Sequence, residues 1–223
     1  QSRSPNASAA TVEPMDLNDG LVAYYPFDGN ANDASGNDHD GVVSAASLTT
    51  DRLGREESAY LFDGLNSVIT FGSNEFNNTF NQGSFSFNAW VLKSGDSNGY
   101  ETIFSHTVQS YDQRIYSTND NFIGYRNESK GDLVVTEDGV FSDEIWIMLS
   151  ITYDSNSSSL KIFVDRHLIN TGTAENWVDV NHPYEIGDNS ESASNRNWNG
   201  KIDDVRIYNR ALSDAEIQAL YDG

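Results

Sequence analysis

Oxygen-bearing side chains are concentrated between residues 27 and 41, where the sequence reads FDGNANDASGNDHDG. The acidic and amide residues considered there as metal ligands are Asp28, Asn30, Asn32, Asp33, Asp38 and Asp40. Calcium takes roughly six to eight oxygen ligands, which a turn of this composition can offer through side chains and carbonyls. The segment therefore indicates a calcium site. An alternative stays open, because Asp and Asn also build Asx turns without any ion.

Catalytic motifs are not evident. Glycoside hydrolysis needs two carboxylates at a set separation, whereas the acidic pairs here are adjacent: Glu137-Asp138, Asp143-Glu144 and Asp203-Asp204. Adjacent residues of a strand point to opposite faces, so these pairs do not supply that separation. The chain has no cysteine, and none of its four histidines stands beside a G-x-S-x-G nucleophile motif. The sequence therefore favours a binding protein over an enzyme.

Aromatic and cationic residues in the middle of the chain are of the types that bind sugars. Aromatic faces contact the apolar C–H patches of a sugar, and arginine makes bidentate contacts with acidic groups. The candidate contacts are Trp177, Tyr125, Arg126, Arg114, Tyr111, Tyr116 and His106. Tyr100 belongs to the same region, and Trp177 has Asn176 and Asp179 as neighbours rather than core residues. The alternative is that the tyrosines complete a core and the arginines pair with carboxylates.

Charge narrows the choice of partners. The 223 residues include 34 Asp and Glu against 13 Lys and Arg, which gives a net charge of −21. Nucleic-acid binding needs a basic surface, and anionic membranes repel an acidic one, so neither partner is expected. No apolar run approaches the roughly 18 residues of a membrane-spanning helix, which argues against membrane insertion. The same charge favours neutral or weakly charged polysaccharides over densely sulfated ones.

The elements that must position these residues are predicted to be strands. Residues 1–19 lack apolar periodicity and indicate a linker or disordered N-terminal tail, followed by one domain over residues 20–223. The predicted strands are residues 21–27, 58–62, 67–71, 84–93, 100–107, 121–126, 132–136, 145–153, 159–165 and 199–208. Short strands at regular spacing predict an all-β sandwich.

Two strands and one helix are well defined by pattern. One face of strands 84–93 and 145–153 is predicted to be core: Phe85, Phe87, Ala89, Val91, Ile145, Ile147, Leu149, Ile151 and Tyr153. Trp90 and Trp146 lie mid-strand on the mixed face and are predicted to be structural. Ser213 and Glu216 form a capping box, which predicts a short C-terminal helix packed on the edge of the sandwich.

Several sequence blocks follow one another in a specific order and spacing. They are GLVAYYPFDGNANDASGNDHDG (20–41), SAYLFDG (58–64), SFSFNAWV (84–91), LSITYD (149–154), LKIFVD (160–165) and GKIDDVRIYNRALSDAEIQALY (200–221). Together they resemble the LamG-like (laminin G-like) domains of the concanavalin A-like lectin/glucanase superfamily. The resemblance implies a jelly-roll β-sandwich of two antiparallel sheets, often with a structural calcium ion. Residues 95–145 and 171–198 carry little of this family signal, and ligand contacts often lie on such variable loops.

The resemblance adds calcium ligands from the far end of the chain. In the family the first and last strands are adjacent, which would bring Asp203 and Asp204, and Asp63 of a second FDG turn, towards residues 27–41. The expected ligands are Asp28, Asn30, Asp63, Asp203 and Asp204, with Asp28, Asn30 and Asp204 preferred. Strand alternation predicts that only one of Asp203 and Asp204 faces the ion. The alternative is that Asp204 pairs with Arg206.

The family implies modules that are appended to secreted or cell-surface proteins. The leading interpretation is a non-catalytic carbohydrate-binding module that targets a larger, multidomain bacterial protein to a polysaccharide. One alternative is an adhesion or structural module that binds proteins or surfaces. Another is a divergent polysaccharide lyase or glycoside hydrolase, although the E-x-D-x-x-E and R-x-E-x-R signatures of such jelly-roll enzymes are absent.

Overall fold

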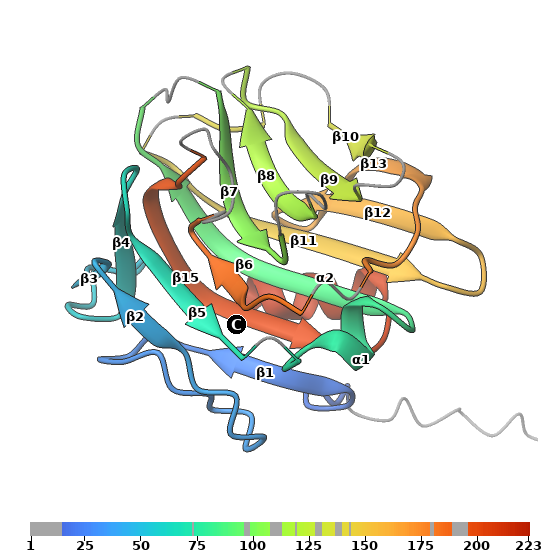
Figure 1. The fold of residues 1–223 in the computed structure, drawn as a ribbon, viewed down its shortest axis with the longest axis horizontal. Coiled ribbons are helices and arrows are strands. Elements are labelled where there is room, and N and C mark those ends of the chain that lie inside the picture. Colours follow the sequence, from blue (N-terminus) through green and yellow to red (C-terminus); the bar gives the residue numbers. More distant parts are fainter. Residues whose placement is uncertain are drawn as a thin grey trace, which may run out of the picture.

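A computed structural model of the chain shows two layers of β-strands (Figure 1). It describes residues 15–72, 74–95, 99–107, 113–118, 120–127, 131–136, 140–142, 144–178, 181–188 and 196–223, with the backbone alone for 131–134. Within these residues every strand pairing is antiparallel. The expected all-β jelly-roll sandwich is confirmed.

The first sheet contains the longest strands. Its order in the described chain is β13 (His167–Thr173), β12 (Ser159–Val164), β11 (Trp146–Asp154), β6 (Phe85–Lys93), β15 (Asn199–Tyr208), β4 (Ala59–Asp63) and β3 (Ser47–Thr49). β1 (Leu21–Tyr25) also pairs with β15, so the first and last strands lie side by side as the resemblance implied.

The second sheet is built largely from the middle of the chain. Its order in the described chain is β10 (Gly131–Val135), β9 (Ile123–Asn127), β8 (Arg114–Thr118), β7 (Tyr100–Ser105), β14 (Tyr184–Ile186), β5 (Val68–Phe71) and β2 (Val42–Ser44). β2, β3, β8, β13 and β14 were not among the predicted strands. Three of these contain only three residues each, too few for a period-2 pattern to appear.

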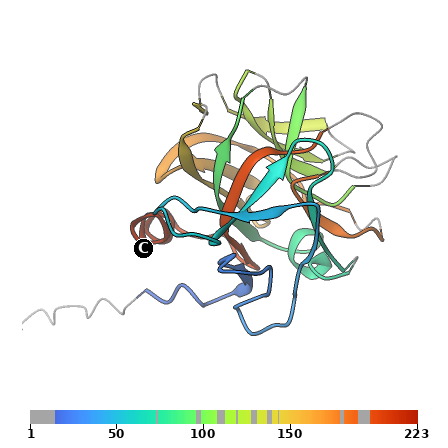
Figure 2. The same cartoon turned by 90° about the vertical axis from the view of Figure 1, so that its left-hand side faces the viewer.

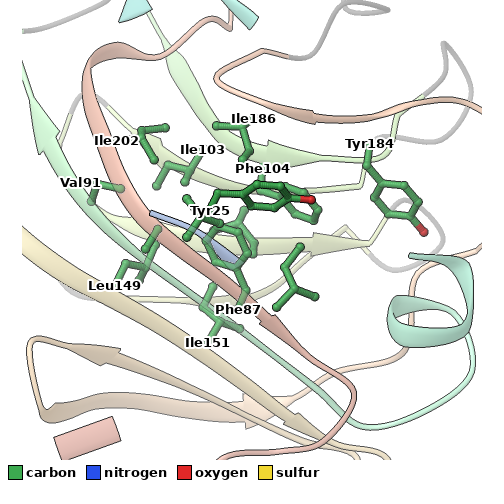
Figure 3. Packing of buried hydrophobic residues seen from close by; sticks show 14 of the residues in the cluster. Tyr25, Phe87, Val91, Ile103, Phe104, Leu149, Ile151, Tyr184, Ile186 and Ile202 are labelled. Atoms are coloured by element: carbon green, nitrogen blue, oxygen red, sulfur yellow. The ribbon is translucent and has the colours of Figure 1, made fainter. Parts of the chain in front are cut away.

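Large apolar side chains fill the space between the sheets (Figure 3). Phe87 and Leu149 of the first sheet point towards Phe104 and Ile186 of the second. The predicted inward faces of β6 and β11 are buried as expected, except that Ile145 precedes β11 and is 55% exposed. Full burial of each such side chain contributes about 1.5–3 kcal/mol, so this core is the main source of stability.

The C-terminal helix α2 (Asp214–Asp222) begins at the predicted capping box. Ser213 accepts a hydrogen bond from the Glu216 backbone, and Glu216 accepts one from the Ser213 backbone. The helix lies against the outer face of the first sheet rather than its edge (Figure 2). There Leu212, Ile217 and Leu220 pack with Trp90, Met148, Phe163 and Tyr208. Trp90 is therefore structural, as predicted. A short helix, α1 (Asn77–Phe80), lies between β5 and β6.

The structure describes the last part of the segment that was predicted to be a tail. Residues 1–14 of the expected tail lie outside the described residues, but residues 15–19 contact the domain. Leu17 packs against the cluster under α2, and Arg210 donates a hydrogen bond of 2.8 Å to the Asp19 carbonyl oxygen. Among the described residues, no helix has the length and apolar character needed to span a bilayer.

Candidate functional site

Alternation along β8 and β9 determines which side chains of the second sheet face away from the core. Ile115 belongs to the core, so Arg114 and Tyr116 on either side of it point to the outer face. Tyr125 belongs to the core, so Arg126 points outward. Arg114 and Arg126 are direct partners in the β8–β9 pairing, which places them side by side. The structure thus brings together three predicted sugar contacts, Arg114, Tyr116 and Arg126.

The two arginines belong to a row of polar residues that crosses the outer face. The successive cross-strand partners are Thr70, Glu185, Ser105, Arg114 and Arg126. A polar outer face is usual where water covers an antiparallel sheet. Here, however, Glu185, Ser105 and Arg114 are buried. Burial of charged groups is costly without compensating contacts, so these residues form an organised and largely buried polar row rather than an ordinary solvated sheet face.

Tyr100, at the start of β7, gives this face an exposed aromatic ring. The residue is 42% exposed, and its ring centre lies 5.3 Å from that of Tyr116 in an edge-to-face arrangement. The guanidinium carbon of Arg114 lies 5.2 Å from the Tyr100 ring centre and 5.0 Å from that of Tyr116. Arg196 approaches the Tyr100 ring to 6.0 Å. Cations at such distances interact favourably with ring faces and hold the rings in position.

A surface hollow of about 310 Å³ adjoins this ring. It is lined by Gly99, Tyr100, Thr118, Asp120 and Phe122. Aromatic surface beside a hydroxyl and a carboxylate combines an apolar contact area with groups that fix the orientation of a ligand. The hollow, together with Arg114 and Tyr116, is called the Tyr100 site below.

Tyr116 supports the Tyr100 site from within. Its ring lies over Gly124 of the neighbouring strand, where a Cβ atom would collide with the ring. Glycine in a strand often marks such a close approach. Tyr116 is 1% exposed, so it positions Tyr100 rather than offering a face of its own.

Two predicted sugar contacts, Trp177 and Tyr125, lie in the core instead. Trp177 is 1% exposed, and its ring centre lies 4.9 Å from that of Phe80 and 5.8 Å from that of Tyr125, stacked on both. The Trp177 indole N–H donates a hydrogen bond of 3.0 Å to the Arg126 carbonyl oxygen. The Tyr125 hydroxyl donates one of 2.9 Å to the Glu175 carbonyl oxygen. Rings enclosed in this way offer no face to a sugar, so the core alternative holds for both.

The two remaining predicted sugar contacts are His106 and Tyr111. His106 is fully buried, with its ring stacked on Tyr184 at a centre-to-centre distance of 3.9 Å, so it too is a core residue. Tyr111 lies outside the described residues. Tyr100 was recognised in the sequence as an aromatic residue of the middle segment, but it was not predicted to contact the sugar. Its position beside Arg114 depends on the β7–β8 register, which the sequence does not reveal.

The predicted metal ligands are only partly brought together. Asp28, Asp203 and Asp204 line one cleft of about 230 Å³ beside α2, which is called the Arg52 cleft below. Asn30 instead accepts a 2.8 Å hydrogen bond from the Asn32 backbone. Asp63 accepts hydrogen bonds from the backbone N–H groups of three residues of its own turn, Leu65, Asn66 and Ser67. Backbone donors of this turn lower the Asp63 pKa to about 2, despite the opposing effect of desolvation. Asn30 and Asp63 thus take part in Asx turns, which is the alternative that the sequence left open.

Asp203 and Asp204 do not point to opposite faces, contrary to the prediction from strand alternation. The β15–β6 register shifts between Asp203 and Arg206, and Asp204 adopts a left-handed conformation with φ of 53°. A bulge of this kind interrupts the strict alternation of side chains. Both carboxylates therefore line the Arg52 cleft. Burial, and then the charge of Asp204, raise the pKa of Asp203 to about 7, although Arg52 acts in the opposite direction.

Arginines hold the acidic groups of the cleft. Arg52 lies 3.3 Å from Asp203 and 3.6 Å from Asp204, measured between nitrogen and oxygen. Arg206 lies 3.0 Å from Asp204, as the alternative interpretation of that residue predicted. Arg55 lies 3.9 Å from Asp28.

The donor set of the cleft does not fit a calcium ion. Asp203 Oδ1 and Asp204 Oδ1 are buried without a hydrogen-bond partner, but two oxygens are far fewer than the roughly six to eight that calcium needs. Among the described residues, no group of three or more His, Asp or Glu side chains is arranged to hold a metal. Each carboxylate that lines the cleft is already in contact with a guanidinium group.

Fold and sequence together define a lectin-like β-sandwich. The family model for the concanavalin A-like lectin/glucanases superfamily, Laminin_G_3, matches residues 63–218, so the chain belongs to this family. No curated protein matches the sequence.

Solved structures of binding domains share the fold. Domain 4 of AbnA, a GH43 extracellular arabinanase from Geobacillus stearothermophilus solved with arabinotriose, is 18% identical with a TM-score of 0.71, over 90% of this chain and 98% of that one. The receptor binding domain of botulinum neurotoxin C/D mosaic serotype is 16% identical with a TM-score of 0.73, over 93% of this chain and 52% of that one. The binding domain of Paraclostridial Mosquitocidal Protein 1 is 19% identical, with a TM-score of 0.73. The match covers 92% of this chain and 52% of that one. The chain thus spans about half the length of the toxin domains.

Proposed function

We propose that the chain is a non-catalytic carbohydrate-binding module and that the Tyr100 site contacts the sugar. The observation that carries the proposal is the exposed Tyr100 ring, held by Arg114 and Tyr116 beside a hollow that contains Asp120. A rigid aromatic face suits the apolar side of a sugar ring, and nearby polar groups suit its hydroxyls. The arabinotriose complex of the AbnA domain, which has the same fold, supports the proposal.

The polysaccharide is proposed to be neutral or weakly charged. The net charge of −21 repels a polyanion over distances of about one Debye length. Arg114 and Arg126 are cross-strand neighbours, but Arg114 is buried and both already take part in other contacts, so they add little open positive charge to the surface. Binding to a densely sulfated glycan, weakening steeply with salt and lost on substitution of both arginines, would contradict the preference for neutral chains.

The module is proposed to act outside the cell as part of a larger protein. AbnA is an extracellular enzyme that carries a domain of this fold. Tethering of a binding module raises the effective concentration of an attached enzyme near its substrate without any chemistry by the module itself. The domain order of the complete gene product tests this part directly: a neighbouring catalytic or surface-anchoring domain is expected.

Affinity gel electrophoresis with a panel of polysaccharides that includes arabinan tests the site. Tyr100→Ala should weaken binding by about 5- to 150-fold, which corresponds to the roughly 1–3 kcal/mol of one aromatic stacking contact. Tyr100→Phe, which keeps the ring, should retain most of the affinity. Leu168→Ala is the matched control, because Leu168 is 46% exposed on the other sheet.

The outcomes separate the rival functions. Full binding by a folded Tyr100→Ala variant would place the sugar site elsewhere. No glycan binding at all, combined with specific protein binding, would favour the adhesion module. Release of reducing or unsaturated products from any polysaccharide of the panel would favour the enzyme.

A further inference from the structure

Arg52 bridges two buried carboxylates where the first and last strands meet. One terminal nitrogen donates a 3.3 Å hydrogen bond to Asp203, and the other lies 3.6 Å from an Asp204 oxygen, so the guanidinium group forms an ion pair with each carboxylate. The Arg52 guanidinium carbon lies 4.4 Å from the centre of a Trp90 ring. The Arg52 side chain is 13% exposed, and those of Asp203 and Asp204 are 1% and 12% exposed.

The β15 bulge creates the need for a cation at this point. It turns two consecutive acidic side chains into one cleft in which both are largely buried, so their mutual repulsion is poorly screened. Such a pair is stabilised by a bound metal ion, by a fixed organic cation or by protonation of one carboxyl group. Arginine suits the second solution, because it stays protonated and its planar group can serve two acceptors.

The local chain holds Arg52 in place. It lies in the turn between β3 and β4, directly after Asp51, whose side chain accepts hydrogen bonds of 2.9 Å and 2.8 Å from the backbone N–H groups of Leu53 and Arg55. Arg55 also donates a side-chain hydrogen bond of 2.6 Å to Asp51. The turn is thus closed around Arg52, which limits the freedom of its backbone.

With all three of its carboxyl groups ionised, the charges that line the Arg52 cleft cancel. Its carboxylates are those of Asp28, Asp203 and Asp204, and its guanidinium groups are those of Arg52, Arg55 and Arg206. Arg206 is itself held over Tyr24, with its guanidinium carbon 4.1 Å from the ring centre. A divalent ion entering this set would add two positive charges to a neutral cleft and would have to displace at least one guanidinium group.

We propose that the Arg52 guanidinium group takes the place of a structural cation at the junction of β1 and β15, so that the fold of this chain does not depend on calcium. The proposal concerns the stability of the domain and stands apart from sugar binding at the Tyr100 site. It has a direct consequence. Removal of Arg52 should convert the cleft into a cation site in which Asp203 and Asp204, with Asp28 at the entrance, are the available oxygen ligands.

The unmodified chain provides the first test. Calorimetric melting in EDTA and in excess calcium chloride should give Tm values within about 1 °C of each other, since a ligand that does not bind the native state cannot stabilise it. Elemental analysis of the dialysed protein should find no stoichiometric calcium. A clear fall of Tm in EDTA, with about one calcium ion per chain in the untreated protein, would overturn the proposal.

Arg52→Ala provides the second test. In EDTA this variant should melt on the order of 10 °C lower, because two buried carboxylates lose their shared cation. Calcium should then raise its Tm by several degrees while leaving the unmodified chain unchanged. Arg55→Ala is the matched control from the same cleft, and it should show little response to calcium, because Arg52 and Arg206 remain.

Two further variants keep the test decisive if Arg52→Ala does not fold. Arg52→Met retains apolar contact with Trp90 and should fold at least in the presence of calcium. Arg52→Lys retains the positive charge and should stay insensitive to calcium. Equal calcium sensitivity of Arg52→Met, Arg52→Lys and Arg55→Ala would show that Arg52 is not the substitute cation.

Discussion

Lys93 and Glu101 face each other inside the sandwich, with the ammonium nitrogen 4.0 Å from a carboxylate oxygen and both side chains at most 1% exposed. The ammonium group also donates hydrogen bonds of 3.1 Å to the Thr118 carbonyl oxygen and 3.0 Å to the Asn121 side chain. Glu101 in turn accepts a 3.2 Å hydrogen bond from the Asn199 backbone. The pair therefore joins β6 and β7, one from each sheet, to the start of β15.

Lys93→Met should destabilise the domain by about 3–5 kcal/mol, because it leaves the Glu101 charge buried without the ammonium group opposite it. Urea unfolding at neutral pH measures this loss. The double variant Lys93→Met/Glu101→Leu should recover part of it, because apolar residues often replace a buried ion pair at little cost.

The exposed pair Lys161–Asp214, at 3.4 Å, is the matched control for this experiment. Lys161→Met should change stability by less than about 1 kcal/mol, since solvent screens a surface ion pair. A similar loss in the Lys93 and Lys161 variants would contradict the importance given to burial.

Trp177 should behave as a core residue rather than as a sugar platform. Trp177→Ala should cost about 3–5 kcal/mol in urea unfolding, because the indole packs against Phe80 and Tyr125. Trp177→Phe should cost less, since it keeps an aromatic ring and loses chiefly the hydrogen bond to Arg126. If Trp177→Phe retained full stability and yet lost glycan binding, the core assignment would be wrong.

Local patterns account for the elements that could be predicted from the sequence. The inward faces of β6 and β11 follow from strict alternation, and the start of α2 follows from the Ser213–Glu216 capping box. Both signals arise from neighbouring residues and are preserved when the chain folds. The blocks that resemble LamG-like domains cover these same elements, so fold and family were accessible before the structure.

Long-range contacts account for what could not be predicted. The polar neighbours of Trp177 suggested exposure, but its burial depends on Phe80, which lies far away in the sequence. The pairing of Arg114 with Arg126 depends on the register of β8 and β9. The orientation of Asp203 and Asp204 depends on a β-bulge, and no residue type at this point of the sequence predicts it. Strand alternation alone orients Asp203 and Asp204 incorrectly, and it does not predict the surroundings of Trp177 or the pairing of the two arginines.

The boundary of the N-terminal tail can be located by two deletions. Removal of residues 1–14 should leave Tm nearly unchanged, because a terminal segment without packing contributes little stability. Removal of residues 1–19 should lower Tm by about 2–8 °C, because Leu17 and the Arg210 contact with Asp19 are lost. Calorimetry distinguishes the two. Equal Tm values for both shortened chains would support the predicted boundary at residue 19.

Glu216 should make the stability of the domain depend on acid pH. A hydrogen bond of 2.6 Å from Arg210, together with those from Ser213, lowers the Glu216 pKa to about 2. A free glutamate in the unfolded chain titrates near 4.3, so the unfolded state binds a proton first as the pH falls. The stabilisation from ionised Glu216 is therefore complete above about pH 5 and is lost progressively towards pH 2.

Glu216→Gln tests this dependence, because it keeps the shape of the side chain and removes the charge. At pH 7 the variant should be less stable by about 1–2 kcal/mol, the combined scale of a helix cap and a charge-assisted hydrogen bond. Urea unfolding from pH 7 to pH 3 should show the difference between the two chains shrinking with acidity. Gln218→Glu is the control, because it adds a carboxylate to the same helix away from the capping box. A gap between Glu216→Gln and the unmodified chain that stayed constant down to pH 3 would exclude ionised Glu216 as its source.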